Sequence, residues 1–214
     1  MREAWASRIL DQSPVRVRRA LVYTLPADTP TDIGASSPAG GVEAIDASTA
    51  RFLLIGDPRR ERMLAAYLER GYTGLLVRNG SDAVAFGWLS DPEQPGPFHL
   101  AETIQRLPNY WIFNCWTAPA ARGRGLFKVI LAALCKAARA RMKGPPEAVF
   151  IDTTAGNLPA RRAILASGFQ PAGVVTTCIL GVPRVRWWKW SRWDPGRLHP
   201  QVPRTPAAID HPAS

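Results

Sequence analysis

The sequence predicts one α/β (α+β) domain whose mixed, mostly antiparallel central sheet is flanked by helices on both faces. Three observations lead to this prediction. Strand-like stretches are interspersed with amphipathic helical stretches along the chain. The Asn79-Gly80 turn joins two strands directly, which indicates antiparallel neighbours, whereas connections through helices indicate parallel neighbours. The 214 residues are 46% hydrophobic, which is sufficient for one sizeable core.

Turn residues mark the ends of the elements in the N-terminal half. Residues 1–14 are expected to form a lead-in, and the alternating residues 15–25, rich in Val and Leu, a first strand. Residues 45–52 are a short helix candidate with Asp46 as N-cap. A clearer helix has Pro58 at its first position and ends at Gly71. Strands over residues 75–77 and 83–89 then flank the hairpin turn.

The C-terminal half alternates strands and helices more regularly. Residues 110–117 predict a strand, and an apolar stripe with basic residues at its end predicts a helix over 125–143. The apolar run 148–153 indicates a central strand. Asn157 is the expected N-cap of a helix over 158–167 that stops at Gly168. Residues 174–180 and 185–190 are two final strands, so the domain spans 15–193, and residues 194–214 are expected to be a disordered tail.

Charge and cysteine content narrow the classes of function. The 27 basic and 17 acidic residues leave a net charge of +10, which indicates an anionic partner: nucleic acid, a membrane surface or a phosphorylated small molecule. Cys115, Cys135 and Cys178 are far apart in sequence, which favours free thiols in a reducing compartment over disulfides or a zinc site. With no long apolar run and no signal-like N-terminus, we expect a cytoplasmic protein.

The strongest functional signal is the turn over residues 122–127, Arg-Gly-Arg-Gly-Leu-Phe, between a strand and a long helix. Such a turn leaves backbone N–H groups without helical acceptors, and the helix dipole favours an anion there. Arg122 and Arg124 add positive charge. The Walker pattern is absent, and Lys128 stands where a dinucleotide fingerprint would need glycine. The turn therefore predicts binding of a phosphorylated ligand of another kind.

Residues 117–126, Thr-Ala-Pro-Ala-Ala-Arg-Gly-Arg-Gly-Leu, resemble the acetyl-CoA-binding motif of the GNAT superfamily of N-acetyltransferases. Asn157, followed by a helix that ends in Gly168-Phe169, resembles the next motif of that family. The resemblance covers residues 75–180 well, and residues 15–75 only by the order of elements. It implies a GNAT-like fold and transfer of an acyl group, most simply acetyl, from CoA to a primary amine by direct attack in a ternary complex.

The resemblance also implies where acetyl-CoA, or another acyl-CoA, would bind. The pyrophosphate would lie on N–H groups of the turn, and the pantetheine arm would pair with the preceding strand like an added strand. A backbone N–H of that strand would polarise the thioester carbonyl. The cofactor-binding residues implied in this way are Cys115, Trp116, Thr117, Arg122, Gly123, Arg124, Gly125, Leu126, Phe127, Lys128 and Asn157.

Three positions depart from the pattern of the family. Phe127 replaces the usual Gly or Ala, and Ile164 stands where many members carry a tyrosine that protonates the leaving thiolate. Trp111 stands where some members carry a glutamate. An amine nucleophile must lose a proton, so a base is needed. The candidates for this base are His99, Glu102 and Asp152. A covalent route through Cys115 is disfavoured because no paired histidine is evident.

The last predicted strand is rich in basic and aromatic residues. Its tryptophans are Trp187, Trp188, Trp190 and Trp193. The simplest interpretation is a strand that packs one face on the core. Peripheral contact with a membrane or a lipid-like substrate comes second, and nucleic-acid or homodimer contacts are less favoured.

Two rival functions follow from these features. The tryptophan strand motivates a long-chain N-acyltransferase acting near a membrane. The missing tyrosine motivates a non-catalytic CoA-sensing or nucleic-acid-binding module. The small-molecule amine acceptor stays open between an amino sugar, an amino acid and a polyamine, with a protein N-terminus as a further alternative.

Overall fold

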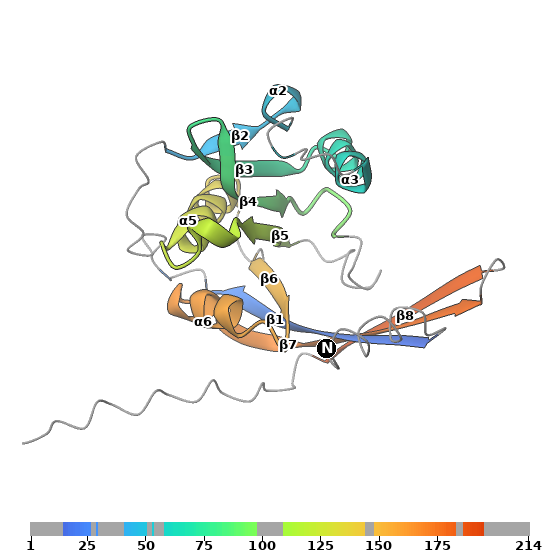
Figure 1. Cartoon of the computed structure of the whole chain (residues 1–214). Helices are drawn as coiled ribbons and strands as arrows, with labels where there is room; N and C mark the ends of the chain where they lie inside the picture. Colours follow the sequence, from blue (N-terminus) through green and yellow to red (C-terminus); the bar gives the residue numbers. More distant parts are fainter. Residues whose placement is uncertain are drawn as a thin grey trace, which may run out of the picture.

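The computed structural model describes residues 15–26, 29, 41–50, 53, 58–97, 109–143, 148–182 and 186–194. These residues form an eight-stranded sheet in the order β2-β3-β4-β5-β6-β1-β7-β8 (Figure 1). Neighbouring strands are antiparallel except β5 and β6, which are parallel. The strands are β1 (Val15–Leu25), β2 (Glu43–Ile45), β3 (Thr73–Asn79), β4 (Asp82–Ser90), β5 (Tyr110–Thr117), β6 (Val149–Thr154), β7 (Gln170–Val182) and β8 (Arg186–Asp194).

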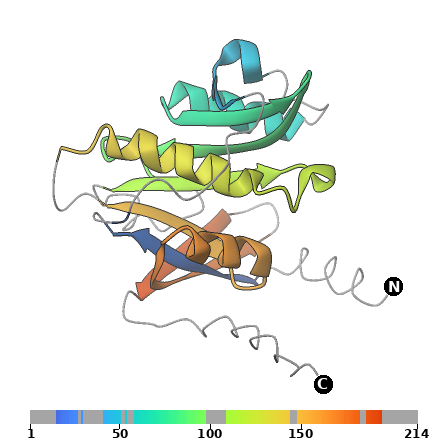
Figure 2. The same ribbon diagram turned by 90° about the vertical axis from the view of Figure 1, so that its left-hand side faces the viewer.

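Helices cover both faces of the sheet, as the sequence predicts. They are α2 (Ala47–Ala50), α3 (Pro58–Glu69), α5 (Leu126–Arg139) and α6 (Leu158–Ala166), with a 3₁₀ turn, η2, at Pro119–Ala121. Figure 2 shows α5 and α6 over the same face, and α3 lies on the other. The mixed, mostly antiparallel fold is thereby confirmed.

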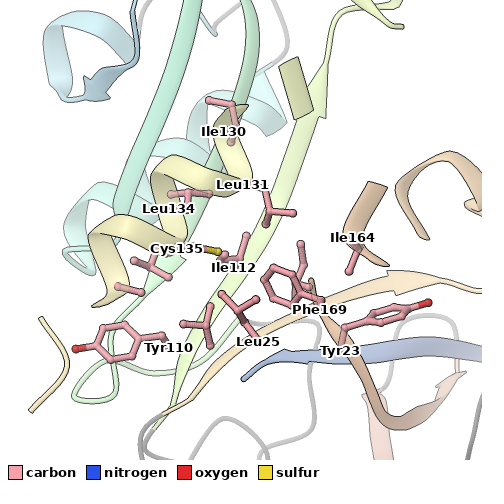
Figure 3. Close-up of a cluster of buried hydrophobic side chains, with 14 of the residues drawn as sticks. Tyr23, Leu25, Tyr110, Ile112, Ile130, Leu131, Leu134, Cys135, Ile164 and Phe169 are labelled. Carbon is pink, nitrogen blue, oxygen red and sulfur yellow. The ribbon is translucent and has the colours of Figure 1, made fainter. Parts of the chain in front are cut away.

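Each face of the sheet has its own hydrophobic core, because alternate residues of a strand point to opposite sides. On β1, Leu21 and Tyr23 pack under α5 and α6, whereas Val22 packs on the side of α3. Figure 3 shows side chains of α5, Ile164 of α6 and Phe169 meeting those of β1 and β5. This packing fixes α5 and α6 relative to the ends of β5 and β6.

The boundaries of several elements differ from the prediction. Ile45 pairs with Gly74 in an unexpected short strand, β2, so the predicted helix over 45–52 starts only at Ala47. Asp46 does cap it, and its Oδ1 accepts the backbone N–H groups of Ser48 and Thr49 at 2.8 Å.

The end of the last strand and the end of the long helix also differ from the prediction. That helix ends at Arg139 instead of residue 143, where Lys143 forms an ion pair with Glu93 at 3.0 Å. Residue 194 belongs to β8, whereas the lead-in over 1–14 and the rest of the tail lie outside the described residues.

The position of β1 is the main topological surprise. This first strand lies between β6 and β7, and Leu21 is opposite both Thr153 and Val174. Among the described residues, β2 is the next strand after β1 in the sequence, and the two do not pair. Within the described residues, no helix is both long and apolar enough to cross a membrane.

Candidate cofactor-binding site

The site begins where the parallel strands β5 and β6 part. Their pairing runs from Tyr110–Val149 to Ile112–Ile151 and then stops. Two residues of β5, Asn114 and Cys115, stand opposite Gly87 of β4, which is a β-bulge, and Asn114 has a left-handed φ of 47°. Because a bulge bends its strand, β5 leaves the direction of β6 and opens a gap between them.

A glycine in β4 makes room for this bulge. A Cβ at Gly87 would lie 2.8 Å from Cys115 Sγ and 2.8 Å from Ile130 Cγ2 of α5. This bulge was not predicted from the sequence, although a glycine inside a strand is a known sign of a bulge or a close approach. Gly87 therefore lets the helix lie directly against the bulged strand.

The bulge also decides which backbone groups of β5 face the gap. The Ala118 N–H donates to Val84 O of β4 at 2.9 Å. Because backbone groups alternate sides along a strand, those of Cys115 and Thr117 point away from β4, toward the gap. The Thr117 carbonyl accepts the Arg122 Nε–H at 3.3 Å, which draws this arginine back toward the strand. A free strand edge of this kind can pair with an extended ligand.

The turn after β5 presents backbone N–H groups, as the sequence predicts. Gly123 and Gly125 have φ angles of 77° and 75°, which residues with a Cβ adopt only with strain. Gly125 is the N-cap of α5, and no side chain caps it. Among the described residues, the backbone N–H groups of residues 123–127 have no backbone acceptor. The first backbone hydrogen bond of the helix is donated by the Lys128 N–H to Gly125 O at 2.9 Å. These donors can cradle an anion.

The gap and the turn form one cavity of about 710 Å³. The cavity is lined by Cys115, Trp116, Thr117, Ala121, Arg122, Gly123, Gly125, Leu126, Phe127, Lys128, Asn157, Pro159, Ala160 and Ala163. It brings together all the predicted cofactor-binding residues except Arg124, which is exposed next to it. The lining contains two cations, Arg122 and Lys128, and no carboxylate. Such a wall favours an anionic ligand.

Helix α6 supplies three of the four lining residues that were not predicted from the sequence, and Ala121 of η2 is the fourth. Pro159, Ala160 and Ala163 stand at helical spacing on one side of α6, and their small side chains leave space for a ligand. The spacing of these small residues is the sequence signal that could have identified them. Asn157 caps the helix as predicted, with Oδ1 accepting the Ala160 N–H at 3.4 Å. Among the residues that the structure describes, none accepts a hydrogen bond from its side-chain N–H groups, so a ligand can do so.

Phe127 and Ile164, the two side chains that depart from the family motifs, both pack in the core under α5 and α6. Phe127 is half-buried, packs against the core under α5 and α6 and also lines the cavity. It therefore lies along the wall and does not fill the turn. Ile164 is completely buried in the same core, so this position carries no hydroxyl that could act as an acid.

The structure does not bring the described base candidate to the cavity. The Asp152 carboxylate accepts the Trp111 Nε1–H at 2.9 Å, and Asp152 is absent from the cavity lining. Trp111 is buried and stacks on Phe150, with ring centroids 5.4 Å apart. His99 and Glu102 lie outside the described residues.

The cavity cysteine is a neutral thiol at ordinary pH. Burial raises the pKa of Cys115 to about 12, and burial likewise raises the pKa of Cys135 to about 12. Since the thiolate is the nucleophilic form, Cys115 is poorly suited to attack a thioester near neutral pH.

Only one tryptophan of the last strand has a described side chain that meets the core. Trp193 lies edge-on to Phe150, with ring centroids 6.1 Å apart, as expected for a strand that packs on the core. The side chains of Trp187, Trp188 and Trp190 lie outside the described part of the structure.

Comparisons with known proteins agree with this geometry. A family model described as the acetyltransferase (GNAT) family matches residues 45–169, more than half of the chain. No curated protein matches the sequence significantly.

Among solved structures, a GNAT acetyltransferase from Colwellia psychrerythraea is 16% identical, with a TM-score of 0.55 over 79% of this chain and 58% of its own. A GNAT-family protein from Novosphingobium aromaticivorans is 19% identical, with a TM-score of 0.52 over 76% of this chain and 63% of its own. A GCN5-related N-acetyltransferase from Sphaerobacter thermophilus is 16% identical, with a TM-score of 0.51 over 82% of this chain and 55% of its own. The chain thus shares their fold and spans less than two thirds of each.

Proposed function

The chain belongs to the GNAT family of acetyltransferases, and from this premise we propose that it transfers the acetyl group of acetyl-CoA to a primary amine. The observation that carries the proposal is the layout of the cavity. One end has a row of free N–H groups with Arg122 and Lys128 nearby, and the other end has the open edge of β5. CoA has a diphosphate at one end and an amide-containing arm at the other, which matches this layout.

Each part of the cavity would hold one part of CoA. The diphosphate would accept the N–H groups of residues 123–127, with Lys128 and the remaining N–H groups of Arg122 beside it. The pantetheine amides would pair with the backbone of Cys115 and Thr117. The side-chain amide of Asn157 could donate to the same arm while its oxygen caps α6. Phe127 would form an apolar wall.

The proposed reaction is direct transfer. The amine nitrogen attacks the thioester carbonyl carbon, a C–N bond forms, the C–S bond breaks and CoA leaves as a thiolate. A backbone N–H of β5 would stabilise the negative charge that develops on the carbonyl oxygen. The raised pKa of Cys115 supports this route over an acyl-enzyme. Asp152 is bound by Trp111, so His99, Glu102 or water would take the proton of the amine.

A pair of glycine substitutions tests the assignment of the cradle. Gly125→Glu places a carboxylate in the proposed diphosphate site. Gly80→Glu is a matched control, since Gly80 lies in the β3–β4 hairpin with a φ of 62° and, like Gly125, has no atom within 4 Å of a Cβ. Both variants carry the same strain and the same charge. We expect Gly125→Glu to weaken CoA binding about 100-fold or more in calorimetry, through the loss of two charge-assisted hydrogen bonds. Equal CoA affinity of the two variants would mean that the site is misassigned.

Turnover assays distinguish the function from its two rivals. Incubation with acetyl-CoA and a panel of amines should release free CoA thiol, and product masses would identify the acceptor. Preference for palmitoyl-CoA over acetyl-CoA would favour the long-chain enzyme instead. CoA binding without turnover on any amine, or tight salt-dependent DNA binding without turnover, would favour the non-catalytic module.

A further inference from the structure

Three strands extend beyond the body of the domain at the end of the sheet that is farther from α5 (Figure 1). Strand β6 pairs with β1 only from Ala20 to Leu25, so residues 15–19 of β1 pair with β7 alone. Figure 1 shows these parts of β1, β7 and β8 running past the end of β6. We call residues 15–19, 176–182 and 186–192 the distal ribbon. It lies away from the cavity, so its role is independent of the proposed acetyl transfer.

The distal ribbon is strongly cationic. Its basic residues are Arg16, Arg18, Arg19, Arg186, Lys189 and Arg192, and these three stretches contain no acidic residue. Arg18, Arg19 and Arg192 are exposed. A protein surface with this much charge of one sign is complementary to an anionic partner.

Exposed aliphatic side chains lie on the same ribbon. Val17 is 60% exposed and Leu180 is 47% exposed, and both are large apolar residues that a core would normally bury. The backbone register places Trp188 opposite Leu180 and Trp190 opposite Cys178. Tryptophan together with aliphatic residues and arginine is typical of proteins that contact the membrane interface.

The register sorts these residues into successive rows on one face. Directly opposite residues of antiparallel strands share a face. The outermost row is Val15, Leu180 and Trp188, the next row is Val17, Cys178 and Trp190, and the third row is Arg19, Thr176 and Arg192. The arginine row stands about 7–13 Å behind the two apolar rows, from a rise of about 3.3 Å per residue. Apolar groups of interfacial proteins enter the headgroup and acyl boundary by about 5–10 Å, so the arginines would meet lipid phosphates.

We propose that the distal ribbon docks on an anionic lipid bilayer, with its apolar rows in the interface and Arg19 and Arg192 at the phosphate level. Nucleic acid is the weaker alternative, because the exposed Val17 and Leu180 offer nothing to a phosphate backbone and cannot stack on bases. A second copy of the chain is disfavoured, because it would bring two sets of like charges together without a carboxylate in either ribbon.

Vesicle flotation tests the proposal with two double variants that remove basic residues and a third that removes apolar residues. The full-length protein is mixed with vesicles of phosphatidylcholine alone, or with vesicles that also contain phosphatidylglycerol, at low and high salt. We expect binding to the anionic vesicles that salt weakens. Arg19→Ser with Arg192→Ser should weaken it about 30-fold, since each interfacial cation contributes about a fivefold change. The matched control is Lys136→Ser with Arg162→Ser, which removes two exposed cations from α5 and α6 and should have far less effect.

The apolar rows need a separate variant. Val17→Ser with Leu180→Ser leaves the net charge unchanged and should weaken vesicle binding about fivefold or more per residue, from the apolar area that would be buried. All variants should keep the CoA affinity and the melting temperature of the wild type within error, which excludes misfolding.

Several results would overturn the proposal. One is the absence of binding to anionic vesicles at low salt. Another is an equal loss in the Lys136 and Arg162 control, which would mean that binding follows overall charge only. A third is a dimer in sedimentation that Val17→Ser with Leu180→Ser dissociates without lipid. The last is DNA binding that requires Arg19 and Arg192 while vesicles are not bound.

Discussion

Substitution of Gly87 by alanine tests whether the close approach of α5 to the bulged strand positions the anion cradle. The added Cβ would lie 2.8 Å from Cys115 Sγ, 2.8 Å from Ile130 Cγ2 and 2.9 Å from Leu134 Cδ1. Carbon atoms pack at about 3.5–4.0 Å, so the side chains of α5 and of Cys115 must move away from β4 by about 0.7 Å. Ile130 and Leu134 are completely buried, which leaves them little room to turn aside.

The expected magnitudes follow from this overlap. Overpacking of a core costs about 1–3 kcal/mol, and 2 kcal/mol in a domain of this size lowers the melting temperature by about 4–8 °C. Because Gly125 stands only five residues before Ile130, about one and a half helical turns, the same displacement shifts the cradle. Loss of about half of one charge-assisted hydrogen bond, about 1.4 kcal/mol, weakens CoA binding about tenfold.

Gly74→Ala provides the matched control. A Cβ there would lie 2.8 Å from Trp88 Cζ3 and 2.9 Å from Ile45 Cβ, on the face of the sheet away from the cavity. It should lower the melting temperature in calorimetry as much as Gly87→Ala does. In titration calorimetry, its CoA affinity should stay at the wild-type value. The reasoning is refuted if Gly87→Ala is destabilised like Gly74→Ala and yet binds CoA as tightly as the wild type.

Three further predictions concern individual side chains. Cys115→Ser should retain turnover, because burial raises the pKa of this thiol to about 12. Intact-mass spectrometry of the wild type with acetyl-CoA should find no acetylated enzyme. An acetyl adduct that the wild type forms and Cys115→Ser does not form would contradict direct transfer. Asn157→Ala should lose about 1 kcal/mol of stability in urea unfolding through the missing cap. Asn157→Asp keeps the cap but should bind CoA more weakly, and an unchanged CoA affinity would exclude Asn157 from the site. Hydrogen bonds from the Ser48 hydroxyl and the Thr49 backbone and side chain lower the pKa of Asp46 from 3.8 to about 2, so this carboxylate stabilises the fold above pH 4 and loses that contribution as the pH falls toward 2. Acid unfolding followed by circular dichroism should therefore be less steep for Asp46→Asn, and identical pH profiles would contradict this account.

Local patterns in the sequence were sufficient for most elements and for most of the residues that line the cavity. The hairpin at Gly80, the caps at Asp46 and Asn157 and the glycine turn before α5 depend on residues a few positions apart. Their backbone conformations and hydrogen bonds can therefore be predicted without knowledge of the rest of the fold. The same holds for ten of the eleven predicted cofactor-binding residues, which a strand, a turn and a helix bring to one cavity.

Other features depended on contacts between distant parts of the chain, which only the tertiary structure decides. Trp111 donates to Asp152 across 41 positions, and Asp152, the only base candidate among the described residues, does not line the cavity. The bulge at Asn114 requires Gly87 of another strand and Ile130 of a helix.

The placement of β1 is the largest contribution of tertiary structure. It lies between β6 and β7, and its overhang past β6 creates the distal ribbon. By itself, the sequence determined an alternating strand with three arginines and, far along the chain, a second strand rich in tryptophan. Only Arg19 of these three arginines shares a face with the apolar rows and Arg192. That arrangement depends on register between strands more than 150 residues apart, because a shift by a single residue would move every side chain to the opposite face.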